Sequence, residues 1–484
     1  MNGCLCGAPA HGGLSAKFSI QWAERVTIVM QKLFVRDASF YEKLLAIAVP
    51  VALQNLITVG VSMLDTLMLG SLGEVQLSAS SLANQWFYML TVINFGLAGG
   101  ANVLVAQYWG KGEPEHIKKV LSITYKVSIV ISLLFAAAAL CIPEVIMSIF
   151  TPDAEVIAAG CQYLRIIGWV YPLYALGNNT IMILRAVGTV RISLLVYSIS
   201  FVVNGFLNWV FIFGNLGAPR MEIQGAALAT AIARVVEFLI VAAFLFRVED
   251  KIFFRPADVL AHSPEMLRSF ASSATPIIFN DMIWALGNSM ITVIMGRMGK
   301  EFVAANSINS VVMQFATVAV MGLSSASAAI IGNTVGAGEY DRARERARTL
   351  VFLGAIVGAV GGLFIFTIRP FIIGFYNISD ITRGYAMSFM AISSVLVFFQ
   401  AQSGINMMGT LRGGGDGKFV MVSDVIFMWM ICIPLGYVAG LRFGLAAPLV
   451  YMIIKCDEVL KSIIGIFRVL GGKWVRDMTR QTLS

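Results

Sequence analysis

The first half of this 484-residue chain repeats in the second half at a shift of 226 positions. Pro50 falls on Pro276, Gly110 falls on Gly336, and further glycines of the first half meet glycines of the second without a gap for more than sixty residues. Two copies of one unit in a very apolar chain are typical of a duplicated membrane transporter.

Composition and apolar runs support a membrane protein. The chain is 58% hydrophobic and 13% charged, with a mean hydropathy of +0.80, whereas soluble domains are about half apolar and a quarter charged. Runs of about 20 residues can cross a bilayer, and we find twelve, six per repeat, near 44–69, 82–108, 120–142, 156–182, 190–213, 223–246, 270–296, 306–333, 349–372, 384–411, 419–441 and 444–467. Because an even number keeps both copies in the same orientation, we expect an all-α polytopic membrane protein with 12 transmembrane helices in two pseudo-two-fold-related six-helix lobes.

Positive charge orients the expected spans. The two tails and the even-numbered connections hold 25 Lys and Arg residues, and the other connections hold 6. This bias places both termini in the cytoplasm, with a cytoplasmic N-terminal extension (1–43), an N-lobe (44–246), a cytoplasmic linker (247–269), a C-lobe (270–467) and a cytoplasmic tail (468–484). The net charge of +8 then faces anionic lipid, so we expect the lipid bilayer and no nucleic acid as a partner.

The N-terminal extension lacks the pattern of a cleaved signal peptide. We expect residues 18–35 to form an amphipathic helix on the inner leaflet, with a poorly ordered extension as the alternative. The six cysteines are scattered, and Cys4 and Cys6 supply only half the ligands of a zinc site, so we expect no disulfide framework and no metal site.

Asp65 is an acid inside the first span, fifteen residues after Pro50. A charged side chain at the bilayer centre costs roughly 2.5–3.5 kcal/mol on insertion scales, so Asp65 should face protein or a water-filled cavity. A carboxyl group that is neutral when protonated and charged when bare suits proton-coupled antiport, and its oxygens could equally bind Na⁺. The structural alternative is a carboxylate that only accepts hydrogen bonds from a neighbouring helix.

Asn204 and Asn208 lie four residues apart in the fifth span and therefore share one helix face. Two amides there can hydrogen-bond a carboxylate or offer carbonyl oxygens to a cation. Thr230, in a small-residue run of the sixth span, is a weaker candidate for the same cluster. Polar contacts between packed helices are the alternative for the two asparagines, and a close-packing face of small residues is the alternative for Thr230.

These motifs resemble the multidrug and toxic compound extrusion (MATE) family, in particular its bacterial NorM/DinF-like branch, over about residues 42–470. The resemblance implies two six-helix lobes around a central cavity, export of organic cations or other amphipathic compounds in exchange for H⁺ or Na⁺, no cofactor, and the bacterial cytoplasmic membrane. It also implies that the Asn pair lies across from the first-span Asp, and we expect a monomer. The segments that carry it are Pro50 with 65–73, Leu184-Arg185 with Gly188, 204–209, and Leu411-Arg412 with Gly415-Asp416.

The second repeat matches the family less well. Asp281 follows Pro276 by five residues, whereas the resemblance places the family's acid about a turn further on, near Trp284. We expect Asp281 to take part in cation coupling or to attract cationic substrate. Trp284 is a candidate to stack on an organic cation, with ordinary packing, the commoner role of a lone Trp in a span, as the alternative. The family's acid in the tenth span falls on an alanine between Gln400 and Gln402, so we expect these glutamines to line the cavity and Asp65 to be the better coupling candidate.

Pro50 and Pro276 are candidate hinges, because proline permits bending within a helix. A position near the start of a helix, where proline fits without strain, is the alternative. When the two halves of the sequence are aligned at a shift of 226 residues, Asp281 corresponds to Asn55 and Asp65 corresponds to Ile291. The two lobes therefore share a scaffold of prolines and glycines but not their polar groups.

Enzymatic readings are weak, because the three histidines lie in tails or loops and the sequence has no Gly-Lys-Ser/Thr loop for ATP. The alternative function is a lipid-linked saccharide or lipid flippase of the same superfamily fold. Such a protein tends to line its cavity with several cations, whereas Asp65 and Asp281 are the cavity charges expected here. A membrane receptor without transport is a third possibility, and it would not need Asp65.

Overall fold

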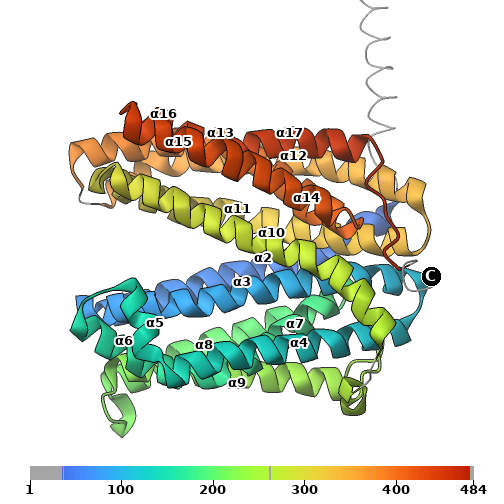
Figure 1. Ribbon diagram of the computed structural model, residues 1–484, viewed down its shortest axis with the longest axis horizontal. Helices are drawn as coiled ribbons and strands as arrows, with labels where there is room; N and C mark the ends of the chain where they lie inside the picture. The colour runs from blue at the N-terminus through green and yellow to red at the C-terminus, as the bar shows by residue number, and fades with distance from the viewer. Residues whose placement is uncertain (1–34, 36, 261–262, 377, 480–484) are drawn as a thin grey trace, which may run out of the picture.

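The computed structural model describes residue 35 and residues 37–260, 263–376 and 378–479. Within them the chain is 88% helical and contains no strand, and it forms the bundle of long helices shown in Figure 1. The helix expected at 18–35 and nearly all of the N-terminal extension lie outside the described residues.

The helices of the first half follow the expected spans closely. A 3₁₀ turn joins α6 to α7, so that together they cross the bundle once. The short helix α5 was not expected from the sequence. The bounds are α2 (Ala38–Gly70), α3 (Glu74–Lys111), α4 (Pro114–Cys141), α5 (Pro143–Phe150), α6 (Ala154–Ile167), α7 (Tyr171–Ala186), α8 (Arg191–Phe213) and α9 (Glu222–Arg247).

The second half begins in the same way and then becomes less regular. Helix α13 runs on through a π-helical stretch at Gly404–Leu411, and α14 and α15 belong to one continuous span that ends at Arg442. The bounds are α10 (Pro264–Arg297), α11 (Lys300–Gly336), α12 (Tyr340–Gly374), α13 (Asp380–Ser403), α14 (Gly417–Asp424), α15 (Ile433–Tyr437), α16 (Ala447–Ile454) and α17 (Cys456–Leu470).

Eleven helices of the described chain are long and apolar enough to cross a membrane. The twelfth expected span is divided at Lys455, whose φ of −101° and ψ of 5° interrupt the helix between α16 and α17. Charge explains part of this break, because α17 opens with Asp457 and Glu458, which favour the N-terminus of a new helix.

Both candidate hinge prolines lie inside long helices. Pro50 is within α2 and Pro276 within α10, so the alternative of an unstrained position at a helix start does not apply. Because proline lacks the N–H that would bond four residues back, each helix has a weakened point on the path between its two ends.

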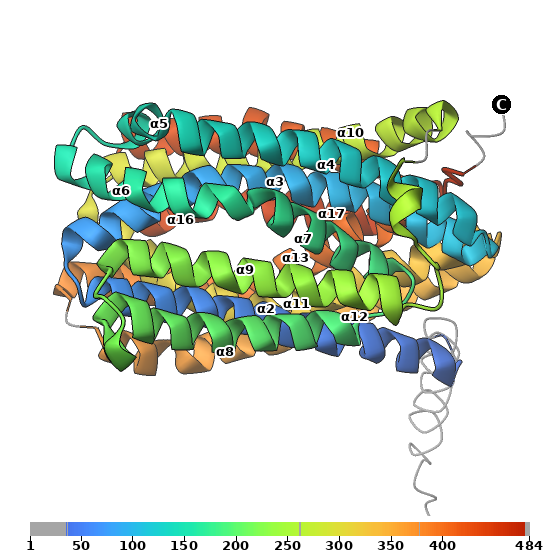
Figure 2. The ribbon, with the colours of Figure 1, turned by 90° about the horizontal axis from the view of Figure 1, so that it is seen from below.

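The two halves of the chain form two lobes. In Figure 1 most of the length of helices α2 to α9 lies in one layer and most of α10 to α17 in the other, and α10 crosses toward the first layer at one end. The N-terminus of α2 and the C-terminal end of the described chain lie at the same end of the bundle (Figures 1 and 2), which we name the terminal end. The connection between α2 and α3 therefore lies at the opposite end, which we name the far end.

The lobes meet along a seam of glycines. These glycines lie in the C-terminal halves of α3 and α11, which run toward the terminal end. A Cβ atom on Gly100 would lie 2.3 Å from the Cα of Ala274 in α10, and one on Gly336 would lie 1.9 Å from the backbone oxygen of Gln107 in α3. Such close backbone approach is possible only without side chains. The seam therefore brings the two lobes into backbone contact towards the terminal end.

A segment after α17, residues 471–479, crosses this seam, and we name it the C-terminal strap. The Gln107 side chain of the first lobe donates to the Arg476 oxygen (3.0 Å) and accepts from the Met478 N–H (2.8 Å). On the second lobe, the Arg476 N–H donates to the Gly414 oxygen at 2.8 Å, and Trp474 is fully buried. The strap thus bonds to both lobes where they meet.

A buried ionic cluster holds α17 to α14 in the second lobe. The Lys461 ammonium lies 2.8 Å from Asp457 and 3.0 Å from Asp424, and all three side chains are buried. Buried charges are tolerated when they are paired in this way.

Candidate functional site

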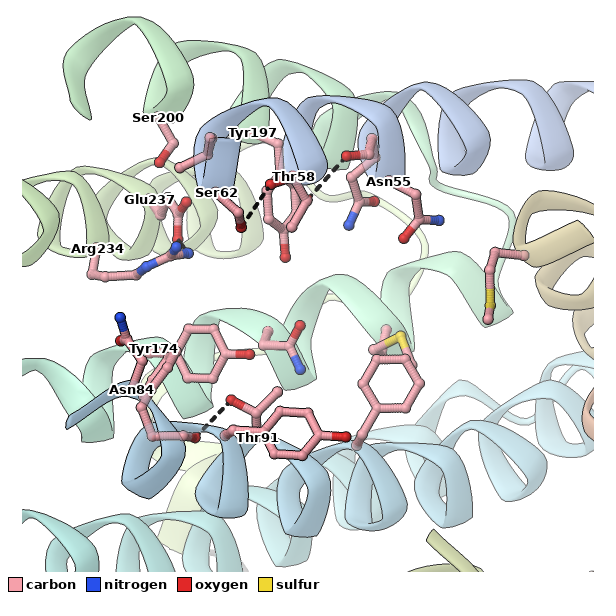
Figure 3. A pocket seen from close by; sticks show the side chains of 18 of the residues that line it. Asn55, Thr58, Ser62, Asn84, Thr91, Tyr174, Tyr197, Ser200, Arg234 and Glu237 are labelled. Carbon is pink, nitrogen blue, oxygen red and sulfur yellow. Dashed lines mark hydrogen bonds and ion pairs between the residues drawn. The ribbon is translucent and has the colours of Figure 1, made fainter. Parts of the chain in front are cut away.

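A cavity of about 690 Å³ opens mainly within the first lobe. Its walls come from α2, α3, α6, α7, α8 and α9, with contributions from α11 and residues 408–413 of the second lobe. Figure 3 shows α2 and α8 on one side of the cavity and α3 and α7 on the other, with polar side chains from all four. A cavity of this size can hold a drug-sized molecule.

Asp65 lines this cavity and is tied to the two asparagines. The Asn208 amide donates to a carboxylate oxygen of Asp65 at 2.5 Å and to the Asn204 carbonyl at 3.2 Å. Asn204 in turn donates to the Thr230 hydroxyl at 3.3 Å. The structure therefore brings together four residues that the sequence singled out on three separate helices.

Close packing of α8 on α2 makes this contact possible. Gly205 lies between the two asparagines in sequence, and a Cβ atom there would be 2.9 Å from the Cδ2 of Leu64, the neighbour of Asp65. Without a side chain at Gly205, α8 can approach α2 closely enough for the short Asn208 side chain to reach the carboxylate.

The cluster offers oxygen atoms suited to a proton or a monovalent cation. Asp65 supplies one carboxylate, Asn204 and Thr230 supply neutral oxygens, and the Asn208 carbonyl is buried without a hydrogen-bond partner. The described residues contain no group of three or more His, Cys, Asp or Glu side chains that could hold a metal ion. One carboxylate among neutral oxygens suits a singly charged ion better than a divalent one, which favours several carboxylates.

One face of α9 adds an ion pair to the same cavity. Thr230, Arg234 and Glu237 all line it, at a spacing that places them on one helix face. Arg234 donates to Glu237 at 2.6 Å, and its guanidinium lies 5.4 Å from the centre of the Tyr174 ring. Figure 3 shows Arg234 and Glu237 together on one side of the cavity, with Tyr174 on the opposite side. The sequence reasoning missed their place in the cavity, although the spacing from Thr230 was a usable signal.

Two arginines from the repeated Leu-Arg motif also line the cavity. Arg185, at the end of α7, donates to the Gln54 side chain of α2, and Arg412 forms a 2.6 Å ion pair with Asp281. From the sequence, both arginines were counted as loop charges and as part of the family resemblance, and neither was placed in the cavity. Their recurrence at a shift of 227 in a mostly apolar chain was the available signal.

The second-lobe predictions need correction. Asp281 does not line the cavity, because the nearby Arg412 guanidinium engages its carboxylate. Trp284 packs against the core of the second lobe, and Gln402 donates to the Val351 oxygen at 2.8 Å across to α12. Gln400 is also absent from the cavity wall. Asp281, Trp284 and Gln402 make contacts within their own lobe, and periodicity alone does not distinguish such a position from a cavity face.

The expected charge of the cavity was therefore wrong. Its wall carries Arg185, Arg234 and Arg412 together with Asp65 and Glu237. A wall with charges of both signs does not disfavour a flippase in the way that the expected acidic wall did.

Comparison with known proteins agrees with the repeat and the fold. The MatE family model matches residues 50–210 and again 276–438, so each match begins at one of the two candidate hinge prolines. The uncharacterized transporter YisQ of Bacillus subtilis is 23% identical over 419 residues, covering 85% of this chain and 90% of that protein. A protein named "probable multidrug resistance protein NorM" from Rhizobium meliloti is 28% identical over 421 residues, with 83% and 86% covered.

Solved structures share the same fold. An outward-facing multidrug resistance MATE family transporter of the MOP superfamily superposes with a TM-score of 0.81 at 17% identity, covering 89% of this chain and 96% of that one. The Vibrio cholerae MATE transporter VcmN in its bent form gives a TM-score of 0.81 at 16% identity, with 92% and 98% covered. With two matches of the family model spread over both lobes, the chain belongs to the MatE family and is a multi-pass membrane transporter, not an enzyme.

Proposed function

We propose that this protein is a secondary active antiporter that exports amphipathic compounds across the cytoplasmic membrane in exchange for H⁺ or Na⁺ bound at Asp65. The observation that carries the proposal is the Asp65 carboxylate, which faces a drug-sized cavity and is held by Asn208. The names of the NorM relatives support multidrug export, and the alternative of a flippase has no comparable support.

The proposed orientation has the terminal end in the cytoplasm. The excess of Lys and Arg in the connections and tails at that end supports it. The glycine seam and the C-terminal strap then close the cytoplasmic side, and the cavity belongs to an outward-facing state. In this state substrate leaves and the coupling ion enters.

In the proposed cycle the coupling ion acts through the Asp65–Asn208 contact. A proton on Asp65 or a Na⁺ on its oxygens removes the negative charge that strengthens this hydrogen bond. The outer part of α2, beyond Pro50, is then free to repack against α8. Movement at that point would change the shape of the cavity beside Asp65 and favour release of the substrate.

The test is transport of rhodamine 123, a fluorescent organic cation, by purified protein in liposomes. Wild type should move the dye against its concentration gradient when a pH or Na⁺ gradient is imposed. Asp65→Asn keeps the size of the side chain and one oxygen that can accept from Asn208, but it cannot change its charge, so it should bind the dye and lose gradient-driven movement. Glu74→Gln, which removes an exposed acid at the far end, is the matched control and should transport normally.

The coupling ion follows from the same liposomes. A pH gradient without Na⁺ that sustains transport identifies H⁺, and a Na⁺ gradient at equal pH that sustains transport identifies Na⁺. Uphill transport by Asp65→Asn at the wild-type rate would refute the assignment of Asp65 as the coupling residue.

A further inference from the structure

Arg185 is a buried cation that forms no ion pair with an acidic side chain among the described residues. Its side chain lines the cavity, and only 8% of the residue is exposed. Among the described residues its contacts are the neutral Gln54 amide oxygen and the Met182 sulfur at 3.4 Å, while its Nε has no hydrogen-bond partner. Buried charges are normally paired because desolvation is costly, so this guanidinium needs an explanation.

The internal repeat shows what is missing beside Arg185. Its counterpart in the second lobe, Arg412, has Asp281 as a counter-ion at 2.6 Å. At the repeat shift of 226 the position of Asp281 corresponds to Asn55. The first lobe has therefore kept the arginine without the acid that neutralises it in the second lobe.

A second unpartnered donor lies on the same face of α7. Asn178, Met182 and Arg185 all line the cavity, at a spacing that places them on one side of the helix. The Asn178 amide nitrogen is buried and has no hydrogen-bond partner in the described structure. Two unsatisfied donors, one of them cationic, thus share the α7 wall of the cavity.

We propose that Arg185 and Asn178 form an oxyanion subsite in the cavity, which binds the carboxylate or phosphate of an amphipathic substrate. The guanidinium fork suits a carboxylate or a phosphate, and the Asn amide adds a donor in line with it. In the substrate-free cavity the Gln54 oxygen takes the place of one anion oxygen. This inference rests on the proposed export function and adds a substrate class, namely compounds that carry an acidic group, including zwitterions.

Rhodamine 110 and rhodamine 123 provide a matched pair of probes, because the second dye is the methyl ester of the first. The esterified dye is a cation, and the free acid carries an additional carboxylate. Binding of each dye to detergent-purified protein is measured by fluorescence polarisation. Wild type should bind rhodamine 110 at least about tenfold more tightly than Gln54→Glu does. The reason is that the free energy of a charge-assisted hydrogen bond corresponds to a factor of about this size in affinity.

Gln54→Glu is the decisive variant because it is nearly isosteric and leaves Arg185 in place. The new carboxylate lies where the Gln54 oxygen already contacts the guanidinium, so it supplies the missing counter-ion and competes with the dye. Rhodamine 123 should bind both proteins within about twofold. Arg185→Gln should lose rhodamine 110 binding as Gln54→Glu does. Arg185→Lys should bind rhodamine 110 more tightly than Arg185→Gln but less tightly than wild type, because Lys supplies the positive charge without the bidentate guanidinium.

The melting temperature of the substrate-free protein is an independent readout. Gln54→Glu should raise it, because a buried cation gains a partner. The oxyanion could also belong to a lipid headgroup, and displacement of rhodamine 110 by added phosphatidylglycerol would identify that source for the same subsite.

Equal affinity of wild type, Gln54→Glu and Arg185→Gln for rhodamine 110 would overturn the subsite, as would an absence of rhodamine 110 binding to wild type. Failure of the export function is distinguishable. It would appear as normal discrimination between the two dyes together with no gradient-driven transport of rhodamine 123.

Discussion

The glycine seam makes a prediction about the balance between the two transport states. In Gly100→Ala the new Cβ atom would lie 2.3 Å from the Cα and 2.5 Å from the Cβ of Ala274. Carbon atoms in contact prefer about 3.5–4.0 Å, so α10 must retreat by about 1 Å or more. The same retreat lengthens the 3.1 Å hydrogen bond from the Ser273 hydroxyl to the Gly100 oxygen.

The magnitude follows from these two contacts. Overpacking of this kind costs about 1–3 kcal/mol, and a lost hydrogen bond costs about 0.5–1.5 kcal/mol. The cost applies only to the state in which the seam is closed, because separated lobes do not have this contact. A net shift of about 2 kcal/mol would change the ratio of the two states by roughly thirtyfold toward the state with an open seam.

Spin labels at Ser71 and Lys300, both exposed at the far end, report this change by pulsed electron spin resonance. Gly100→Ala should shift the distance distribution toward shorter values, because opening the seam brings the far ends together. Gly177→Ala is the control, since its Cβ would meet its nearest neighbour, the Cα of Phe238, at 3.8 Å. Both variants gain the same helix propensity, so identical distributions for Gly100→Ala and wild type would refute the reasoning.

Three further predictions concern charges outside the proposed coupling cluster. Asp281→Asn should lower the free energy of unfolding by about 3–5 kcal/mol, because it leaves Arg412 buried without a counter-ion. The protein that remains folded should keep gradient-driven transport in liposomes. Loss of this transport at normal stability would contradict the prediction. Lys461→Met should lower the melting temperature, because it leaves two buried carboxylates without their cationic partner. The double variant Lys461→Met with Asp424→Asn should recover part of the loss. If the second substitution recovers nothing, the pairing of Lys461 with Asp424 is not stabilising. In the strap, burial raises the pKa of Asp477, but hydrogen bonds from Thr479 and the Lys111 ammonium outweigh it and hold the pKa below the ordinary 3.8. The contribution of Asp477 to stability is therefore constant above about pH 5 and is lost as the pH falls below 3.8. Amide hydrogen exchange at Met478, corrected for intrinsic rates, should show protection that is lost only in this low range. A loss of protection near pH 6 would contradict the prediction.

Much of the architecture was predictable because membrane spans are a property of local sequence. Each span needs about 20 apolar residues whose backbone is satisfied internally, and the glycine and proline repeat gave the duplication directly. Lys455 marks the limit of this reasoning. Its apolar neighbours predict one long helix, whereas the structure divides the segment there.

The coupling cluster was predictable in part for a similar reason. Asp65, Asn204 and Asn208 are polar residues in apolar spans, and such residues rarely face lipid. Sequence reasoning could not separate two roles for Trp284 and Gln402, because a side chain that packs or bonds within its own lobe has the same sequence pattern as one that faces a cavity.

By itself, the sequence determined the membrane class, the number and order of the apolar spans, the duplication, and the polar residues that had to avoid lipid. These follow from hydropathy and spacing, which are local. Only the tertiary structure decided which polar groups neutralise one another, because partners such as Asp281 and Arg412 are separated by most of a lobe in sequence. For that reason the sequence suggested an acidic cavity, whereas packing of the lobes paired Asp281, left Arg185 without an acid, and gave the cavity both charges.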